Sequence, residues 1–288
     1  MKLVCVATES SVYYEILKES AKRHNYELIT LGWDQQWNGL IWKHTLYKQY
    51  LDTLENEEEV VILSDGYDVI CLRDSKCMLE YYLKFNKPIV FGDQTSFSVK
   101  IAFDTFNKPV KCSGSIIGTV KYLKEMESII LNSGKIEQYN RGDQMLINQL
   151  ANNSEHREFF DKFTTVDLDK QCFMVTQFDT MCNIDYQLYK DIGLEYDNNN
   201  NLFLKSSNTN NESNKIYPCI LHAAGYVNIN KICKKLGYDT TKIKPSNIKF
   251  KLKQIGNMGC YLIKNNKIYM YSSILIVGCL INLLKGYF

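Results

Sequence analysis

The first two thirds of the chain alternate between short aliphatic runs and longer stretches in which apolar residues recur at helical spacing. Short aliphatic and β-branched runs are typical of buried strands, and the recurring spacing is typical of amphipathic helices. The predicted strands are Leu3–Ala7, Tyr26–Leu31, Val60–Leu63, Pro88–Phe91 and Ile216–His222. The predicted helices are Ser11–His24, Leu40–Leu54, Cys77–Phe85, Tyr122–Leu131, Gln144–Ala151 and Asn228–Leu236. This alternation predicts an α/β fold in which helices cover both faces of a mainly parallel central sheet.

Three segments depart from the alternation. Ser113–Gly118 is rich in glycine and serine, small residues that permit a close backbone approach to a ligand or a tight turn into a strand. Asn198–Asn201 and Ser206–Asn214 are polar and rich in asparagine, so we predict loops there.

The C-terminal part of the chain has a different character. From Thr241 to Phe288 it carries eight lysines and no Asp or Glu, and Ile268–Leu284 is an uncharged apolar stretch. A membrane-spanning helix needs roughly 17–25 such residues, and flanking lysines favour the cytosolic side. We therefore predict a domain over 1–240, a basic linker or hairpin over 241–267, and a C-terminal apolar helix over 268–285 that anchors the chain in a membrane. A helix packed on the domain and an amphipathic surface segment are the alternatives.

Charge and cysteine content narrow the function classes. The 34 Lys and Arg residues nearly balance the 32 Asp and Glu residues, so no overall field indicates a nucleic-acid partner. The ten cysteines include no Cys-x-x-Cys pair, and Cys5 and Cys71 lie in or beside apolar runs, which is typical of small buried side chains rather than of a structural zinc site. Met1–Ala7 leads directly into a strand, so we expect no signal peptide, reduced thiols and a location facing the cytosol.

The strongest chemical signal is a pair of aspartates after an aliphatic run. Asp65 and Asp68 follow Val60–Leu63, and ligands of open α/β sheets bind at the carboxyl ends of strands. Two carboxylates there suit a divalent cation held against a phosphate. His222 ends another apolar strand, and imidazole with carboxylates suits Mn²⁺. A turn or helix cap at the aspartates, and a structural role for the histidine, are the alternatives.

Further candidates lie near predicted element ends. Asp143 opens an apparent helix and could simply cap it. If the cation at Asp65 and Asp68 holds the diphosphate of a nucleotide sugar, Asp143 could instead deprotonate the hydroxyl that accepts the sugar, or hold the hydroxyls of the sugar. Tyr67 lies between the two aspartates and could stack on a uracil ring. Trp33, Trp37 and Trp42 supply further aromatic surface, although we expect Trp42 to lie in the core.

The order of these motifs resembles the glycosyltransferase domain of the lysyl hydroxylase and collagen hydroxylysine glycosyltransferase family, including versions carried by large DNA viruses. The resemblance covers roughly Lys2 to Tyr238. The matching segments are, in chain order, Val6-Ala7-Thr8, Asn25-Tyr26, Leu31-Gly32, Trp37-Asn38-Gly39, Lys43, Asp65-Gly66-Tyr67-Asp68-Val69-Ile70, Cys112-Ser113-Gly114-Ser115-Ile116-Ile117-Gly118, Gly142-Asp143-Gln144 and His222-Ala223-Ala224-Gly225.

The resemblance implies a GT-A fold that binds a nucleotide sugar, with UDP-glucose or UDP-galactose as donor and hydroxylysine of a collagen-like protein as acceptor. It implies Mn²⁺ bound by Asp65, Asp68 and His222, Tyr67 stacked on uridine, and Asp143 beside the reacting sugar. The remaining residues of the matching motifs are expected around the donor: Thr8, Lys43, Gly114, Gln144 and Gly225.

Four positions depart from the family pattern. Gly142 stands where the family has Asp, Cys112 and Ala224 where it has Asn, and Asn228 where it has Lys. These departures concern the sugar and acceptor side, so donor-diphosphate binding is expected to be intact. They leave two alternatives open: a GT-A enzyme for another acceptor, such as a surface glycan or a lipid-linked sugar, or a degenerate domain that binds UDP without catalysis.

Overall fold

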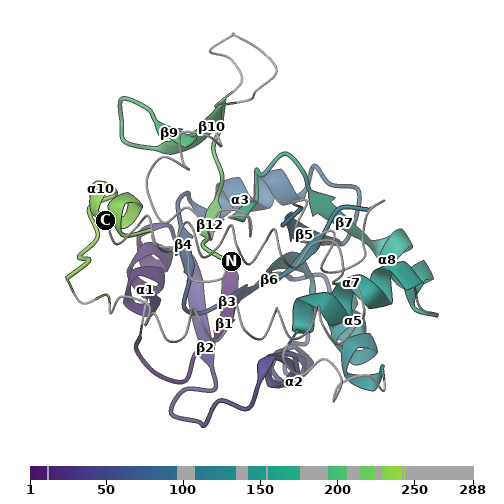
Figure 1. Ribbon diagram of the computed structural model, residues 1–288. Helices are drawn as coiled ribbons and strands as arrows, with labels where there is room; N and C mark the ends of the chain where they lie inside the picture. Colours follow the sequence, from purple (N-terminus) through teal and green to yellow (C-terminus); the bar gives the residue numbers. More distant parts are fainter. Residues whose placement is uncertain are drawn as a thin grey trace, which may run out of the picture.

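The structure is a computed structural model, and it describes residues 1–11, 13–95, 108–133, 142–153, 155–175, 194–205, 215–224, 229–241 and 243. Its centre is a six-stranded sheet with helices on both faces (Figure 1). The strand order is β2 (Glu27–Leu31), β1 (Lys2–Val6), β3 (Val60–Asp65), β6 (Lys111–Thr119), β5 (Ile89–Asp93) and β7 (Thr164–Asp167).

The sheet is mixed rather than purely parallel. Within this sheet β6 alone runs antiparallel to its neighbours, β3 and β5, while β1, β2, β3, β5 and β7 run in one direction. The predicted α/β class and mainly parallel sheet are therefore confirmed, with one reversed strand in the middle. Because β6 runs antiparallel to β3, the first residues of β6 lie beside the carboxyl end of β3, where Asp65 is.

The prediction for Ser113–Gly118 needs a correction, because the alternative of a tight turn is wrong. This segment forms the middle of β6, and its residues are buried between β3 and β5. A glycine- and serine-rich run has low strand propensity. Small side chains are needed here because Asp65 and His222 lie against the strand. A Cβ at Gly114 would collide with the side chains of Asp65 and His222.

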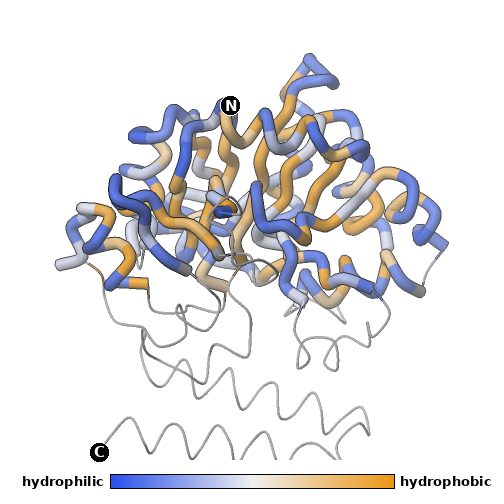
Figure 2. The backbone as a smooth tube through the Cα atoms, turned by 90° about the horizontal axis from the view of Figure 1, so that it is seen from above, coloured by the Kyte–Doolittle hydropathy of each residue, from blue (hydrophilic) through white to orange (hydrophobic). Residues whose placement is uncertain are grey.

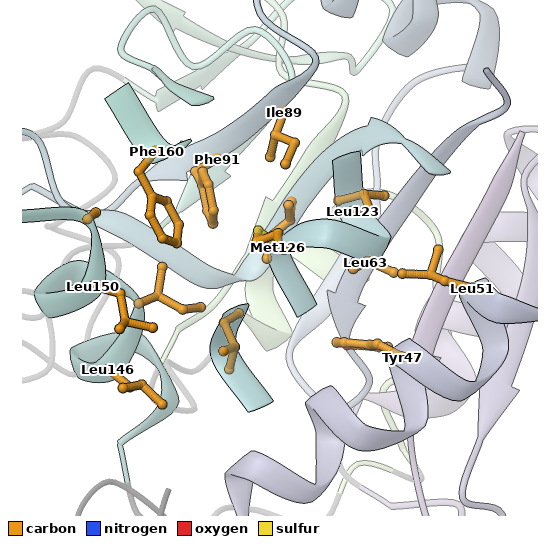
Figure 3. Packing of buried hydrophobic residues seen from close by; sticks show 14 of the residues in the cluster. Tyr47, Leu51, Leu63, Ile89, Phe91, Leu123, Met126, Leu146, Leu150 and Phe160 are labelled. Atoms are coloured by element: carbon orange, nitrogen blue, oxygen red, sulfur yellow. The ribbon is translucent and has the colours of Figure 1, made fainter. Parts of the chain in front are cut away.

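One face of the sheet is covered by α2 (Leu40–Asp52), α5 (Val120–Asn132), α7 (Asp143–Asn153) and α8 (Arg157–Phe163), which Figure 1 shows gathered on one side of the strands. Alternate residues of each strand point to this face, as the pleat of a strand requires. Figure 3 shows their close packing, with Phe91 of β5 against Phe160 of α8 and Leu63 of β3 near Leu51 of α2. Burying each such side chain contributes about 1.5–3 kcal/mol.

The opposite face is covered by α1 (Tyr14–Arg23), α3 (Ser75–Tyr82) and a three-stranded sheet of β4 (Val69–Cys71), β12 (Ile220–His222) and β8 (Phe173–Val175). Because both faces are covered, most residues of β1, β3 and β5 are apolar and buried, and the inner strands are largely orange in Figure 2, between polar outer segments. Cys5 and Cys71 are fully buried on this side, as predicted. α3 begins two residues before its predicted start, where Asp74 accepts a hydrogen bond from the backbone N–H of Lys76.

The strand predicted over Ile216–His222 is two strands. Lys215–Ile216 forms β11 in an antiparallel sheet with β10 (Leu202–Lys205) and β9 (Leu194–Tyr196), whereas β12 joins the sheet of β4 and β8. Pro218 lies between β11 and β12, and proline cannot donate a ladder hydrogen bond. The loop predicted at Asn198–Asn201 is confirmed as the turn between β9 and β10, at the upper left of Figure 1.

The remaining elements complete the domain. The predicted helix over Asn228–Leu236 is observed as α10 (Asn230–Lys235). The described part of the chain holds no helix that is both long and apolar enough to cross a membrane. The predicted loop over 206–214, most of the predicted basic linker and the predicted anchor over 268–285 lie outside the described residues.

Candidate active site

Three of the side chains singled out in the sequence converge at the carboxyl end of β3. One ligand atom from each of Asp65, Asp68 and His222 lies within 4.8 Å of the others. Nε2 of His222 is 3.4 Å from Oδ2 of Asp65 and 3.4 Å from Oδ1 of Asp68. An imidazole and two carboxylates at this spacing can share a divalent cation such as Mn²⁺.

The pairing of strands explains how residues far apart in sequence meet. β3 lies beside β1 with Asp65 opposite Val6, and the turn after it leads into β4. β12 pairs antiparallel with β4, which sets His222 opposite Val69. The backbone N–H of Ala223 also donates to the carbonyl of Asp68 at 2.7 Å. The small sheet therefore holds His222 against the two aspartates.

The charges of this cluster fit a cation. Burial raises the pKa of Asp68, and the nearby Asp65 carboxylate adds to the rise. Oδ1 of Asp68 is buried, and no group among the described residues donates a hydrogen bond to it. A divalent ion would give this oxygen a partner and offset the repulsion between the two carboxylates.

A buried lysine connects the cluster to Asp143. Nζ of Lys43, on α2, is 2.8 Å from Oδ1 of Asp65 and 2.7 Å from Oδ2 of Asp143, the first residue of α7. Lys43 is only 2% exposed, and Asp143 is also buried. Burial would raise the pKa of Asp143, but the positive charges of Lys43 and His44 outweigh it and hold that pKa far below its usual range. Asp143 is therefore a carboxylate at neutral pH.

Tyr67 is fixed by the end of β1. Its hydroxyl oxygen accepts hydrogen bonds from the backbone N–H groups of Thr8, at 2.8 Å, and Glu9, at 3.2 Å. The Thr8 hydroxyl is 3.3 Å from the same oxygen. Tyr67 lies between Asp65 and Asp68 in the sequence, and these hydrogen bonds hold its hydroxyl beside Thr8 and Glu9.

The tryptophans differ in exposure. Trp33 and Trp37, which follow β2, are 41% and 42% exposed, whereas Trp42 is half-buried and packs against the core. Trp33 lies against Tyr14, and Trp37 meets Trp42 edge to face. The core placement predicted for Trp42 is thus observed in part.

A comparison with protein families decides the identity of this domain. The model of the PLOD GT domain, the glycosyltransferase domain of lysyl hydroxylases, matches residues 1–238. The chain belongs to this family. It is therefore a glycosyltransferase of the PLOD GT family, and the resemblance predicted from the motifs is confirmed.

Solved structures similar to this PLOD GT domain include two glycosyltransferases. A glycosyltransferase involved in the glycosylation of the major capsid of PBCV-1 is 9% identical, with 82% of this chain and 98% of that chain covered and a TM-score of 0.46. The galactosyltransferase LgtC, in complex with donor and acceptor sugar analogues, is 11% identical, with 78% and 88% covered and a TM-score of 0.45. No curated protein sequence matches the chain.

The other predicted donor-side residues of this PLOD GT domain differ in how close they lie to the candidate metal ligands. Gly114 lies directly against Asp65 and His222, so it shapes the metal-ligand candidates through its missing side chain. Gln144 follows Asp143 on α7 and is half-buried. Gly225 and Asn228 lie outside the described residues.

Two residues were missed by the sequence analysis of this PLOD GT domain. His44 and Glu127 are both fully buried, and Nδ1 of His44 is 2.8 Å from Oε2 of Glu127. A signal for Glu127 was present, because it falls on the apolar face of α5 with Leu123, Met126 and Ile130. An acidic residue at such a position needs a buried partner.

His222 has its own supporting contacts. Oγ of Ser115 is 2.9 Å from Nδ1 of His222, and Sγ of Cys112 is 3.4 Å from the same nitrogen. When Nδ1 carries the proton, it donates a hydrogen bond to Oγ of Ser115. Nε2 then faces Asp65 and Asp68 with its lone pair. Ser115 therefore supports the tautomer that a metal ligand requires.

Replacing Ser115 by Ala is expected to weaken Mn²⁺ binding by about 10- to 100-fold, because partners behind a ligating histidine contribute that much to metal affinity. Titration calorimetry of the full chain with Mn²⁺ measures this directly. Ser128→Ala is the control, since Ser128 lies on α5 and bonds only within its own helix among the contacts described. Unchanged Mn²⁺ affinity in Ser115→Ala would contradict the supporting role.

Proposed function

We propose that this PLOD GT domain transfers a hexose, glucose or galactose, from a UDP-sugar to a hydroxyl group, with hydroxylysine in collagen-like protein as the acceptor. The observation that carries the proposal is the convergence of Asp65, Asp68 and His222 at the carboxyl end of β3, with Tyr67 between the aspartates. Membership in the family supports a sugar transfer. The UDP donor, the metal and the acceptor are the proposed refinements.

Each residue of the site has a part in the proposed reaction. Asp65, Asp68 and His222 would hold Mn²⁺, which supplies positive charge against the donor diphosphate and stabilises the leaving UDP. The Tyr67 ring, fixed by Thr8 and Glu9, would stack on the uracil. In the reaction, the bond from the anomeric carbon to UDP would break, UDP would keep the electron pair, and the acceptor oxygen would bond to that carbon while its proton passes to the departing diphosphate oxygen.

The charge state of Asp143 bears on its part in this reaction. A carboxylate ion-paired with Lys43 and lying 3.5 Å from Nε2 of His44 is a weak base, because both cations stabilise its ionised form. This favours a role in which Asp143 accepts a hydrogen bond from a sugar hydroxyl over a role in which it abstracts the acceptor proton. Asp143 would then fix the sugar relative to the diphosphate.

The residues that depart from the family pattern near the sugar and the acceptor support two other candidate functions. One is a GT-A enzyme for a surface glycan or a lipid-linked acceptor, and the other is a domain that binds UDP without turnover. Gly142 replaces a family Asp, and Ala224 a family Asn. Among the described residues, a Cβ at Gly142 would meet Met145 alone, at an ordinary 3.6 Å, so a side chain can begin there without a clash with them. The cytosol-facing location and the C-terminal anchor stay predictions.

UDP release by the full chain tests the proposal. With Mn²⁺, we expect one donor among a panel of UDP-sugars to be consumed, and a hydroxylysine-containing collagen peptide to stimulate its consumption. Consumption without peptide stimulation would discard the collagen acceptor and keep the transferase. If no donor is consumed while UDP still binds, the domain without turnover is favoured, and Gly142→Asp is the matched variant in which activity should then be sought.

A further inference from the structure

A row of buried charges runs behind the proposed active site. Glu127 on α5 contacts His44 on α2 at 2.8 Å, and Nε2 of His44 is 3.5 Å from Oδ2 of Asp143 on α7. The same Asp143 oxygen is 2.7 Å from Lys43, which contacts Asp65. The row therefore begins in the helical layer and ends at a metal-ligand candidate.

The signs of these charges alternate along the row. Burial lowers the pKa of His44, but the carboxylates of Glu127 and Asp143 outweigh burial and raise that pKa to about 9, so His44 is an imidazolium at neutral pH. The charged and titratable groups that face it are Glu127 from α5, Asp143 from α7, and Lys43 and Tyr47 from its own helix. Each cation thus lies between two anions.

Core packing alone does not account for this arrangement. Glu127 and His44 have no solvent exposure, and taking charges out of water costs several kcal/mol each unless they are paired. Apolar side chains of similar size would serve the contact between α2 and α5 at least as well. What Glu127 adds is a fixed negative charge that keeps the His44 imidazolium in place and directs its Nε2 toward Asp143.

We propose that Glu127 and His44 are positioning residues for the sugar transfer, and that they hold Asp143 in the orientation and ionisation state that the reaction needs. This inference rests on the proposed function. Asp143 touches the substrate, His44 supplies a second cation on the side of its carboxylate away from solvent, and Glu127 keeps that cation charged. Removing Glu127 takes away a charge that stabilises the His44 imidazolium, and weaker pairing with His44 lets the Asp143 carboxylate turn.

The decisive variant is Glu127→Gln, which keeps the volume of the side chain and removes its charge. We expect its kcat for UDP-sugar consumption to fall by about 10- to 100-fold, because a small displacement of a positioned group costs that much. The KM for the donor and the affinity for Mn²⁺ should not change, since Asp65, Asp68 and His222 are untouched. Glu125→Gln is the control, because Glu125 is exposed on the same helix.

Two further measurements separate positioning from mere stability. Nuclear magnetic resonance titration should show the His44 ring protonated at neutral pH in the wild type and its pKa lowered in Glu127→Gln, with the His44 signal assigned from His44→Gln. The double variant should lose no more kcat than either single variant, because the two residues act through one another. His44→Gln also serves as the test if Glu127→Gln does not fold.

The outcomes distinguish this inference from the proposed function. A folded Glu127→Gln with wild-type kcat would overturn the inference while leaving the transferase intact. Parallel losses of kcat, Mn²⁺ affinity and thermal stability would also overturn it, because they indicate a general structural role. A wild-type chain inactive with every UDP-sugar would remove the proposed function itself, and with it the reaction that Glu127 and His44 are inferred to serve.

Discussion

Asp68→Asn is expected to lower Mn²⁺-dependent UDP-sugar consumption by at least about 100-fold, because metal stabilisation of the leaving group supplies several kcal/mol and each 1.4 kcal/mol is about a factor of ten. Asparagine has the same shape, so the fold around β4 and β12 should persist. The loss should therefore come from Oδ1 of Asp68, the buried oxygen that faces His222. The measurement is the initial rate of UDP release against Mn²⁺ concentration.

The control for this experiment is Asp169→Asn, which removes an exposed carboxylate far from β3 along the chain. It should behave as the wild type. Wild-type rates in Asp68→Asn at every Mn²⁺ concentration would contradict the metal-ligand assignment. Rates restored at high Mn²⁺ would show that Asp68 contributes affinity and that Asp65 and His222 suffice for turnover.

Lys43→Met is expected to cost about 3–5 kcal/mol of unfolding free energy, the usual effect of removing one partner from buried charges. Methionine fills a similar volume, so the loss should come from the Asp65 and Asp143 carboxylates left close together without their shared cation. Urea denaturation of the full chain in the presence of a chelator measures it. Mn²⁺ should restore part of the loss, because it neutralises Asp65 when bound.

Lys48→Met provides a matched control on the same helix. Lys48 pairs with Asp52 in an ion pair at the protein surface, where such pairs contribute about 0–1 kcal/mol. A loss in Lys43→Met no larger than in Lys48→Met would show that the buried lysine is not needed to hold the two carboxylates together.

The part of the fold that the sequence predicted well is the part with clear periodicity. β1, β2 and β3 were found within one or two residues, because aliphatic runs leave a strong pattern, whether buried as in β1 and β3 or half-buried as in the edge strand β2. β6 was missed as a full strand because Gly114 and Ser115 have low strand propensity, and only the neighbouring site explains their size. β8, β9, β10 and α8 are too short for periodicity to distinguish them from loops.

The candidate site shows the same division. The spacing of Asp65 and Asp68 suggested a cation, and the place of His222 at the end of an apolar strand made it a candidate ligand. The family resemblance was needed to join the three residues in one site, since nothing local to His222 reveals that β12 pairs with β4. His44 stood beside Lys43 in a helix without any feature that separated it from its neighbours. Its importance depends on contacts with Glu127 and Asp143, which tertiary packing creates.

The order in which the chain is synthesised gives the small sheet a further significance. β12 is the middle strand between β4 and β8, yet it is the last of the three to leave the ribosome. All six strands of the central sheet, β1, β2, β3, β5, β6 and β7, precede β12 along the chain. During synthesis Asp65 and Asp68 are therefore made long before His222, and the three candidate metal ligands can meet only after most of the domain has been translated.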